Sequence, residues 1–197
     1  MQPTQELLVR PSNPALFAAS RSLFEQRPQL VAEWAESLTD RGAGTRHVPA
    51  ELMQRELRLV VDLFAEMAGP LRREASEIWD RACEHYGRMA AARGLVAGEV
   101  VKEFSALREV VTRDLAASVA ALRARQALAL LLQLSRALDR GAAAAVAGYT
   151  DALVAELFTR DGVPSAENAL ETADVERQLG ALEQELHILS TTPAGGM

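Results

Sequence analysis

Histidine and cysteine are the residues of this chain best suited to hold a metal ion or a haem. The 197 residues include three histidines and one cysteine. His47, His85 and His187 are far apart, and none follows a glutamate at the Glu-x-x-His spacing that di-iron helical bundles use. Cys83 has no second cysteine at Cys-x-x-Cys spacing. We therefore expect no metal and no cofactor.

Catalytic and nucleotide-binding motifs are also missing from the sequence. It contains no glycine-rich dinucleotide string, no phosphate-binding Gly-Lys-Ser/Thr loop and no Gly-x-Ser-x-Gly turn. We expect no catalytic residues and a protein that is not an enzyme.

His85 leaves one alternative open, because a lone histidine on an amphipathic segment suits haem ligation or pH sensing. A structural or solvated histidine is the more common case. Cys83, Trp34 and Trp79 have apolar neighbours at helical spacing, which favours the core over a redox site or a ligand pocket. Arg72-Arg73, near an expected helix start, is most simply a solvated face.

The elements that position these residues all show helical periodicity. Prolines and glycines divide the chain into a flexible arm (1–13), a helical bundle (14–159), a linker (160–168), a helix (169–189) and a disordered tail (190–197). Within the bundle we expect helices over 14–26 and 28–39, a loop over 40–49, helices closing at Gly69 and Gly94, and a long stripe over 100–122. Arg123 to Gln126 is either a turn or solvated helix. Gly141 and Gly148 weaken the helix that follows unless close packing compensates.

The last helix carries two heptads of an apolar seam. Its members are Val175, Leu179, Leu182, Leu186 and Leu189. Two heptads are too short for an independent coiled coil, so the seam needs a cover. Pairing with a second chain is our preferred interpretation, and docking on the same chain's bundle is the alternative.

Composition narrows the class of protein. Apolar residues make up 49% of the chain but aromatic residues only 5%, which favours helix packing over a β-sandwich. The net charge is −6 and the basic residues are scattered, so nucleic acid is an unexpected partner. No signal peptide or membrane anchor is recognisable, and a single cysteine suits a reducing cytoplasm.

One stretch goes beyond periodicity. From Trp79, and over residues 84–111, the chain resembles the N-terminal helical domain of the RsbT co-antagonists of RsbRD type, which is also found ahead of soluble bacterial sensor histidine kinases. The residues that carry the resemblance are Trp79, Arg88, Gly94, Leu95, Glu99, Val100, Val101, Phe104, Leu107 and Arg108. Leu138, Asp139 and Tyr149 are similar to the helix that closes such domains.

The resemblance implies a non-catalytic sensor or regulatory input domain of a bacterial signalling protein. It implies no ligand. Combined with the seam, it leads us to expect an all-α multi-helix bundle with a short coiled-coil-like C-terminal helix, a homodimer, and a signalling or effector protein as partner. A scaffold or adaptor protein, and a haem- or small-ligand-binding helical sensor, are the alternatives.

Overall fold

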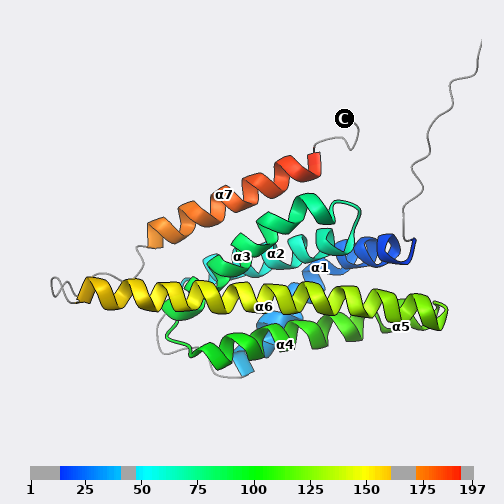
Figure 1. Ribbon diagram of the computed structural model, residues 1–197, viewed down its shortest axis with the longest axis horizontal. Helices are drawn as coiled ribbons and strands as arrows, with labels where there is room; N and C mark the ends of the chain where they lie inside the picture. The colour runs from blue at the N-terminus through cyan, green and yellow to red at the C-terminus, as the bar shows by residue number, and fades with distance from the viewer. Residues whose placement is uncertain (1–13, 41–47, 161–171, 192–197) are drawn as a thin grey trace, which may run out of the picture.

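The computed structural model describes residues 14–40, 48–160 and 172–191, and these ranges form seven helices and no strand (Figure 1). The expected all-α multi-helix bundle is confirmed. The helices are α1 (Pro14–Asp40), α2 (Ala50–Ala68), α3 (Arg72–Ala92), α4 (Ala97–Asp114), α5 (Ala116–Ala120), α6 (Ala124–Arg160) and α7 (Thr172–Thr191).

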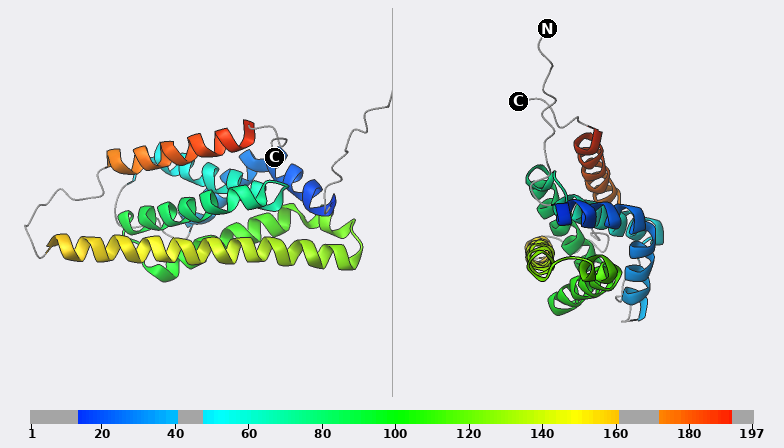
Figure 2. Two further views of the ribbon diagram at one scale, coloured as in Figure 1. Left: turned by 45° about the horizontal axis from the view of Figure 1, so that its top comes forward. Right: turned by 90° about the vertical axis from the view of Figure 1, so that its right-hand side faces the viewer.

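Five helices close into a ring around one core. α1 packs on α2, α2 on α3, α3 on α6, α6 on α4, and α4 on α1 again. α7 lies outside this ring, against α3 and α2, so that α3 lies between α6 and α7 (Figures 1 and 2). α3 is therefore the helix through which α7 meets the rest of the bundle.

Aromatic side chains from three helices meet inside the ring. Trp34 of α1 stacks on Tyr86 of α3, with ring centroids 5.5 Å apart, and Phe104 of α4 meets both rings edge-on. The indole N–H of Trp34 donates to the Glu103 carbonyl at 3.0 Å, and that of Trp79 donates to the Ala137 carbonyl at 3.2 Å. Both tryptophans are fully buried, so the core interpretation of Trp34 and Trp79 is confirmed.

Glycines let α3 and α6 approach closely. A Cβ atom added at Gly87 would collide with the backbone carbonyl of Ala145, and one added at Gly148 would collide with that of Glu84. A Cβ atom at Gly141 would collide with the ring of Trp79. The close packing that Gly141 and Gly148 require is therefore present.

Two expectations about helix boundaries are wrong. Pro28 does not separate two helices but lies inside α1. Leu23, Leu30 and Trp34 are buried on both sides of it, and this burial offsets the loss of one helical hydrogen bond. The stripe over 100–122 is not one helix either, because α4 ends at Asp114 and α5 follows it.

The remaining boundaries differ in detail. Residues 121–123 form the turn into α6, so of the polar interruption only Arg123 lies in the turn, and residues 124–126 are already helical. Arg160 belongs to α6 and Ser190 to α7 rather than to the linker and the tail. The expected arm, most of the linker, the start of the last helix at 169, and His47 lie outside the described residues.

We predict that Gly148→Ala lowers the free energy of unfolding by about 1–3 kcal/mol, because the new methyl group meets backbone that cannot rotate away. Helix propensity alone predicts the opposite sign, a gain of roughly 1 kcal/mol. Urea denaturation measures the difference.

Gly180→Ala is the matched control. Gly180 lies in α7 and a Cβ atom there meets nothing within 4 Å, so propensity acts alone and the variant should be as stable as the parent or more so. Equal effects of the two substitutions would contradict the close-approach account.

Candidate functional site

The residues that carry the family resemblance hold helix ends and helix pairs together. Gly94 has a φ of 76° and ends α3 in a Schellman motif, in which the Leu95 N–H donates to the Ala90 carbonyl at 3.1 Å and the Gly94 N–H to the Ala91 carbonyl at 2.9 Å. Glu99 accepts the Val96 N–H at 2.8 Å and so caps α4.

The two resembling segments also contact each other. Arg108 of α4 pairs with Asp139 of α6, and the Tyr149 hydroxyl donates to the Leu95 carbonyl at 2.9 Å. Phe104 and Leu107 are buried in the core. The motif therefore explains the packing of α3, α4 and α6 rather than a chemical step.

A buried polar cluster, which the sequence reading missed, lies behind the motif. Arg93 donates two hydrogen bonds to the Glu103 carboxylate, at 2.9 and 2.6 Å, and the Tyr86 hydroxyl donates to the same carboxylate at 2.7 Å. Burial, followed by the nearby Glu103 charge, raises the pKa of Tyr86 well above its ordinary value. The signal was available in the sequence, since Glu103 interrupts the apolar stripe of α4 next to Phe104.

The apolar seam of α7 is covered by its own chain. Val175, Leu179 and Leu182 are buried, and Leu186 and Leu189 are half-buried against the core. The covering helices are α3 and α2. We considered pairing of the seam with a second chain and docking on the same chain's bundle, and the structure contains the second arrangement.

His85 ties α7 to the bundle. Its Nδ1 atom lies 2.8 Å from Oε2 of Glu56 on α2, and its Nε2 atom lies 3.1 Å from the backbone carbonyl of Val175 on α7. The side chains of His85 and Glu56 are 2% and 0% exposed, so water does not compete for these bonds. Both ring nitrogens are engaged, and a haem iron would have to displace one of these partners.

The backbone carbonyl of Val175 constrains where the protons of the His85–Glu56 pair lie. A carbonyl only accepts, so Nε2 carries a proton and donates. Nδ1 then bonds to Glu56 only if a second proton lies between the ring and the carboxyl group, on either of them. Without that proton, the ring has one N–H to share between Glu56 and Val175, and one of the two bonds is lost. Contact between His85 and α7 is therefore coupled to one proton.

Polar pairs surround this buried contact. Arg55 of α2 donates twice to Glu183 of α7, at 3.1 and 2.6 Å, and Arg81 of α3 pairs with Glu185 of α7. Arg88, one of the motif residues, donates to Gln178 at 2.9 Å. These groups are partly exposed, and exposed pairs contribute only about 0–1 kcal/mol each, so they orient α7 more than they stabilise it.

Other candidate residues are not part of this site. Cys83 is fully buried, and burial raises the pKa of its thiol well above the ordinary value, which confirms its assignment to the core. His187 is exposed on α7. Within the described ranges, no three His, Cys, Asp or Glu residues are grouped as metal ligands, and no helix has the length and apolar character to cross a bilayer.

The described residues form a closed helical ring with a short helix docked on its outer face. Residues 28–177 match the family model described as the RsbT co-antagonist protein rsbRD N-terminal domain. The chain belongs to this family of stress-signalling regulatory domains, as the resemblance implied. No curated protein and no solved structure matches the chain.

We predict that His85→Leu lowers the free energy of unfolding by about 3 kcal/mol, because it leaves the Glu56 carboxyl buried without its partner. Glu56→Leu combined with His85→Leu should restore most of that loss, since replacing both members of a buried pair by apolar groups is nearly neutral. A double-mutant cycle by urea denaturation checks this, and additive losses would contradict the pairing.

A second prediction concerns pH. Burial raises the pKa of Glu56 above its ordinary value of 4.5, with the nearby Glu183 adding to the effect and His85 and Arg93 opposing it. The folded chain thus keeps a proton that the unfolded chain releases, and the resulting stability is full below about pH 4.5 and is lost as the pH rises through the raised pKa.

Glu56→Gln should remove this loss, because an amide has no acid proton to release and its N–H donates to Nδ1, which leaves Nε2–H for Val175. As the pH rises above about 4.5 and through the raised pKa, the parent should lose stability relative to the variant, by about 1.4 kcal/mol for each unit by which the pKa is raised. Glu51→Gln, on the exposed face of the same helix, is the control. Parallel profiles for the parent and Glu56→Gln would refute the shared proton.

Proposed function

We propose that the chain is a cytoplasmic input domain that relays a change of state through α7 in stress signalling. In one state α7 lies on α2 and α3, and in the other its seam pairs with the α7 of a second chain. A signal that favours one arrangement shifts the population between them. The observation that carries the proposal is the way α7 is held, outside the ring, by one seam and one buried polar contact.

Two features support α7 as the element that changes state. Among the described residues its main contacts are with α3 and α2 on one side, whereas each ring helix is held on two sides. The family match ends at residue 177, so Leu179, Leu182, Leu186 and Leu189 lie beyond it. Four of the five seam residues therefore lie outside the segment that the family model describes.

The heptad spacing supports a second chain as the alternative cover. Val175, Leu179, Leu182, Leu186 and Leu189 occupy successive a and d positions, which suit a partner helix as well as a bundle face. A signalling or effector protein that offers an amphipathic helix would compete for the same seam. The scaffold or adaptor alternative differs in predicting a permanent hetero-complex and no change of state.

We predict that Leu182→Gln combined with Leu186→Gln frees α7 from the bundle and lowers the oligomeric state. The reason is that either cover of the seam depends on these apolar groups, each worth about 1.5–3 kcal/mol when fully buried. Analytical ultracentrifugation gives the oligomeric state, and amide hydrogen exchange of α7 reports its docking. Gln184→Ser, on the exposed face of α7, is the control.

The outcomes separate the two parts of the proposal. A concentration-dependent dimer that the double variant abolishes supports exchange between chains. A parent that stays monomeric at all concentrations rejects the dimer, and α7 amides as protected in the double variant as in the parent reject the releasable helix.

A further inference from the structure

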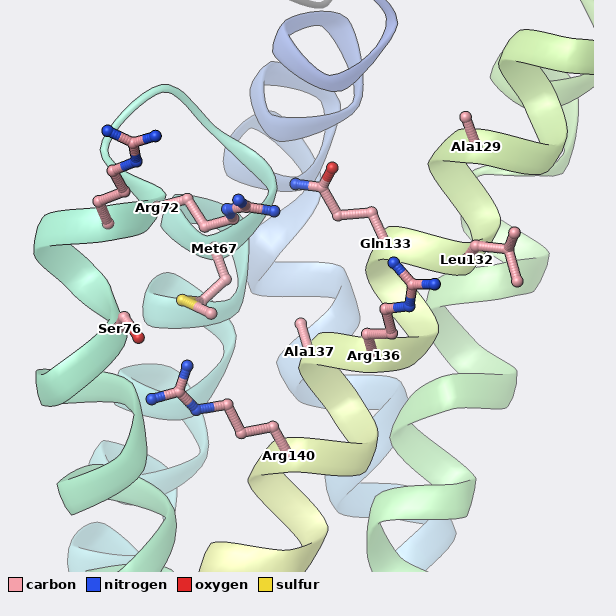
Figure 3. Close-up of a pocket in the computed structure, with 10 residues that line it drawn as sticks. Met67, Arg72, Ser76, Ala129, Leu132, Gln133, Arg136, Ala137 and Arg140 are labelled. Atoms are coloured by element: carbon pink, nitrogen blue, oxygen red, sulfur yellow. The ribbon is translucent and has the colours of Figure 1, made fainter.

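A cavity of about 630 Å³ lies between the start of α3 and α6, on a side of α3 that does not contact α7 (Figure 3). Four arginines line it: Arg72 and Arg73 from the first turn of α3, and Arg136 and Arg140 from α6. No aspartate or glutamate is among its lining residues, although the chain as a whole has 27 acidic residues against 21 basic ones. The lining of the cavity is thus positively charged, whereas the net charge of the chain is negative.

Three of these arginines have no carboxylate partner among the described residues. Arg140 is neutralised by Asp80 of α3, whose carboxylate it contacts through two nitrogens. Arg72, Arg73 and Arg136 form no ion pair with any residue that the structure describes. Arginines elsewhere on the surface, such as Arg55, Arg81 and Arg113, do pair with carboxylates. Arg123 and Arg125 also have no ion pair within the described ranges, but they do not line the cavity, so what distinguishes Arg72, Arg73 and Arg136 is that they line one hollow.

Like charges held together cost free energy unless an anion compensates them. The backbone adds to the field here, because the first turn of α3 has no side-chain cap, and the one acidic residue of that turn, Glu74, does not line the cavity. Figure 3 shows Gln133 and Arg140 extending from α6 towards α3, with Ser76 facing them from the other wall and Arg136 lying along α6. An anion between the helices would thus meet donors on both sides.

The size and the remaining lining of the cavity indicate the kind of anion. Its volume falls within the range of about 300–1,000 Å³ that small-molecule sites occupy. Met67 and Leu132 add apolar surface beside the arginines, and Leu132 is 47% exposed. Guanidinium groups bind phosphate and carboxylate oxygens in pairs, with matched geometry.

We propose that this cavity binds a small organic anion with two or more oxyanion charges, its charged groups on Arg72, Arg73 and Arg136 and its apolar part against Met67 and Leu132. Phosphate esters and polycarboxylates share this chemistry. The bound anion bridges α3 to α6. The proposal does not rest on the role of α7, whose contacts with α3 involve Arg81, His85 and Arg88.

Isothermal titration calorimetry on the full chain tests it, with pyrophosphate and citrate as probes at constant ionic strength and sodium chloride as reference. At least one probe should bind one to one. Arg136→Gln should raise its dissociation constant on the order of tenfold, and Arg72→Gln with Arg73→Gln on the order of a hundredfold, as expected for charge-assisted hydrogen bonds. The probe that binds more tightly identifies the chemical source.

The charge-matched control is Arg123→Gln with Arg125→Gln. Both arginines are exposed, near the start of α6, and do not line the cavity, so affinity should change less than twofold. An equal loss in this control would mean bulk charge rather than a site and would overturn the proposal. It would be overturned too if neither probe binds, including the case in which a polyglutamate peptide or anionic vesicles bind instead.

Discussion

The approach of α3 to α6 without intervening side chains is the constraint on which the other contacts depend. Backbone lies directly against backbone where Gly87 faces Ala145 and where Gly148 faces Glu84. Because backbone has no rotamers, this contact fixes α3 in both translation and rotation relative to α6. The position of every other side chain on α3 follows from it.

α3 therefore contacts three different parts of the structure. Its glycine face meets α6, its aromatic face brings Trp79 and Tyr86 into the core, and its remaining face presents Arg81, His85 and Arg88 to α7. A small rotation of α3 would therefore be felt at the core and at α7 together. Two buried polar side chains of α3, His85 and Tyr86, also depend on hydrogen-bond partners from other helices.

Local pattern was sufficient for the fold class and for much of the core. The three-to-four-residue spacing predicted the helices, and the burial of Trp34, Trp79 and Cys83 followed from their neighbours. Pro28 shows where local rules fail, because its cost is local while the burial that offsets it comes from α2 and α4. A single sequence does not display that compensation.

The candidate sites were less accessible to sequence reasoning, for a related reason. His85 was recognised as unusual, but its partner Glu56 is 29 residues away and Val175 is 90 residues away. Arg72 and Arg73 are exposed, as expected, but the sequence does not show that Arg136 and Arg140 of α6 line the same cavity. Spacing predicts which face of a helix a residue occupies, whereas these sites depend on which helix that face meets.

The burial of Cys83 has a consequence for its oxidation and for cross-linking between copies of the chain. Its sulfur lies at the α3–α6 contact, near Gly141, and it is the only thiol in the sequence. Oxidants and alkylating reagents reach it only when those two helices separate. Disulfide cross-linking between copies is therefore suppressed while the bundle is intact. The rate at which Cys83 is alkylated measures how often α3 and α6 separate.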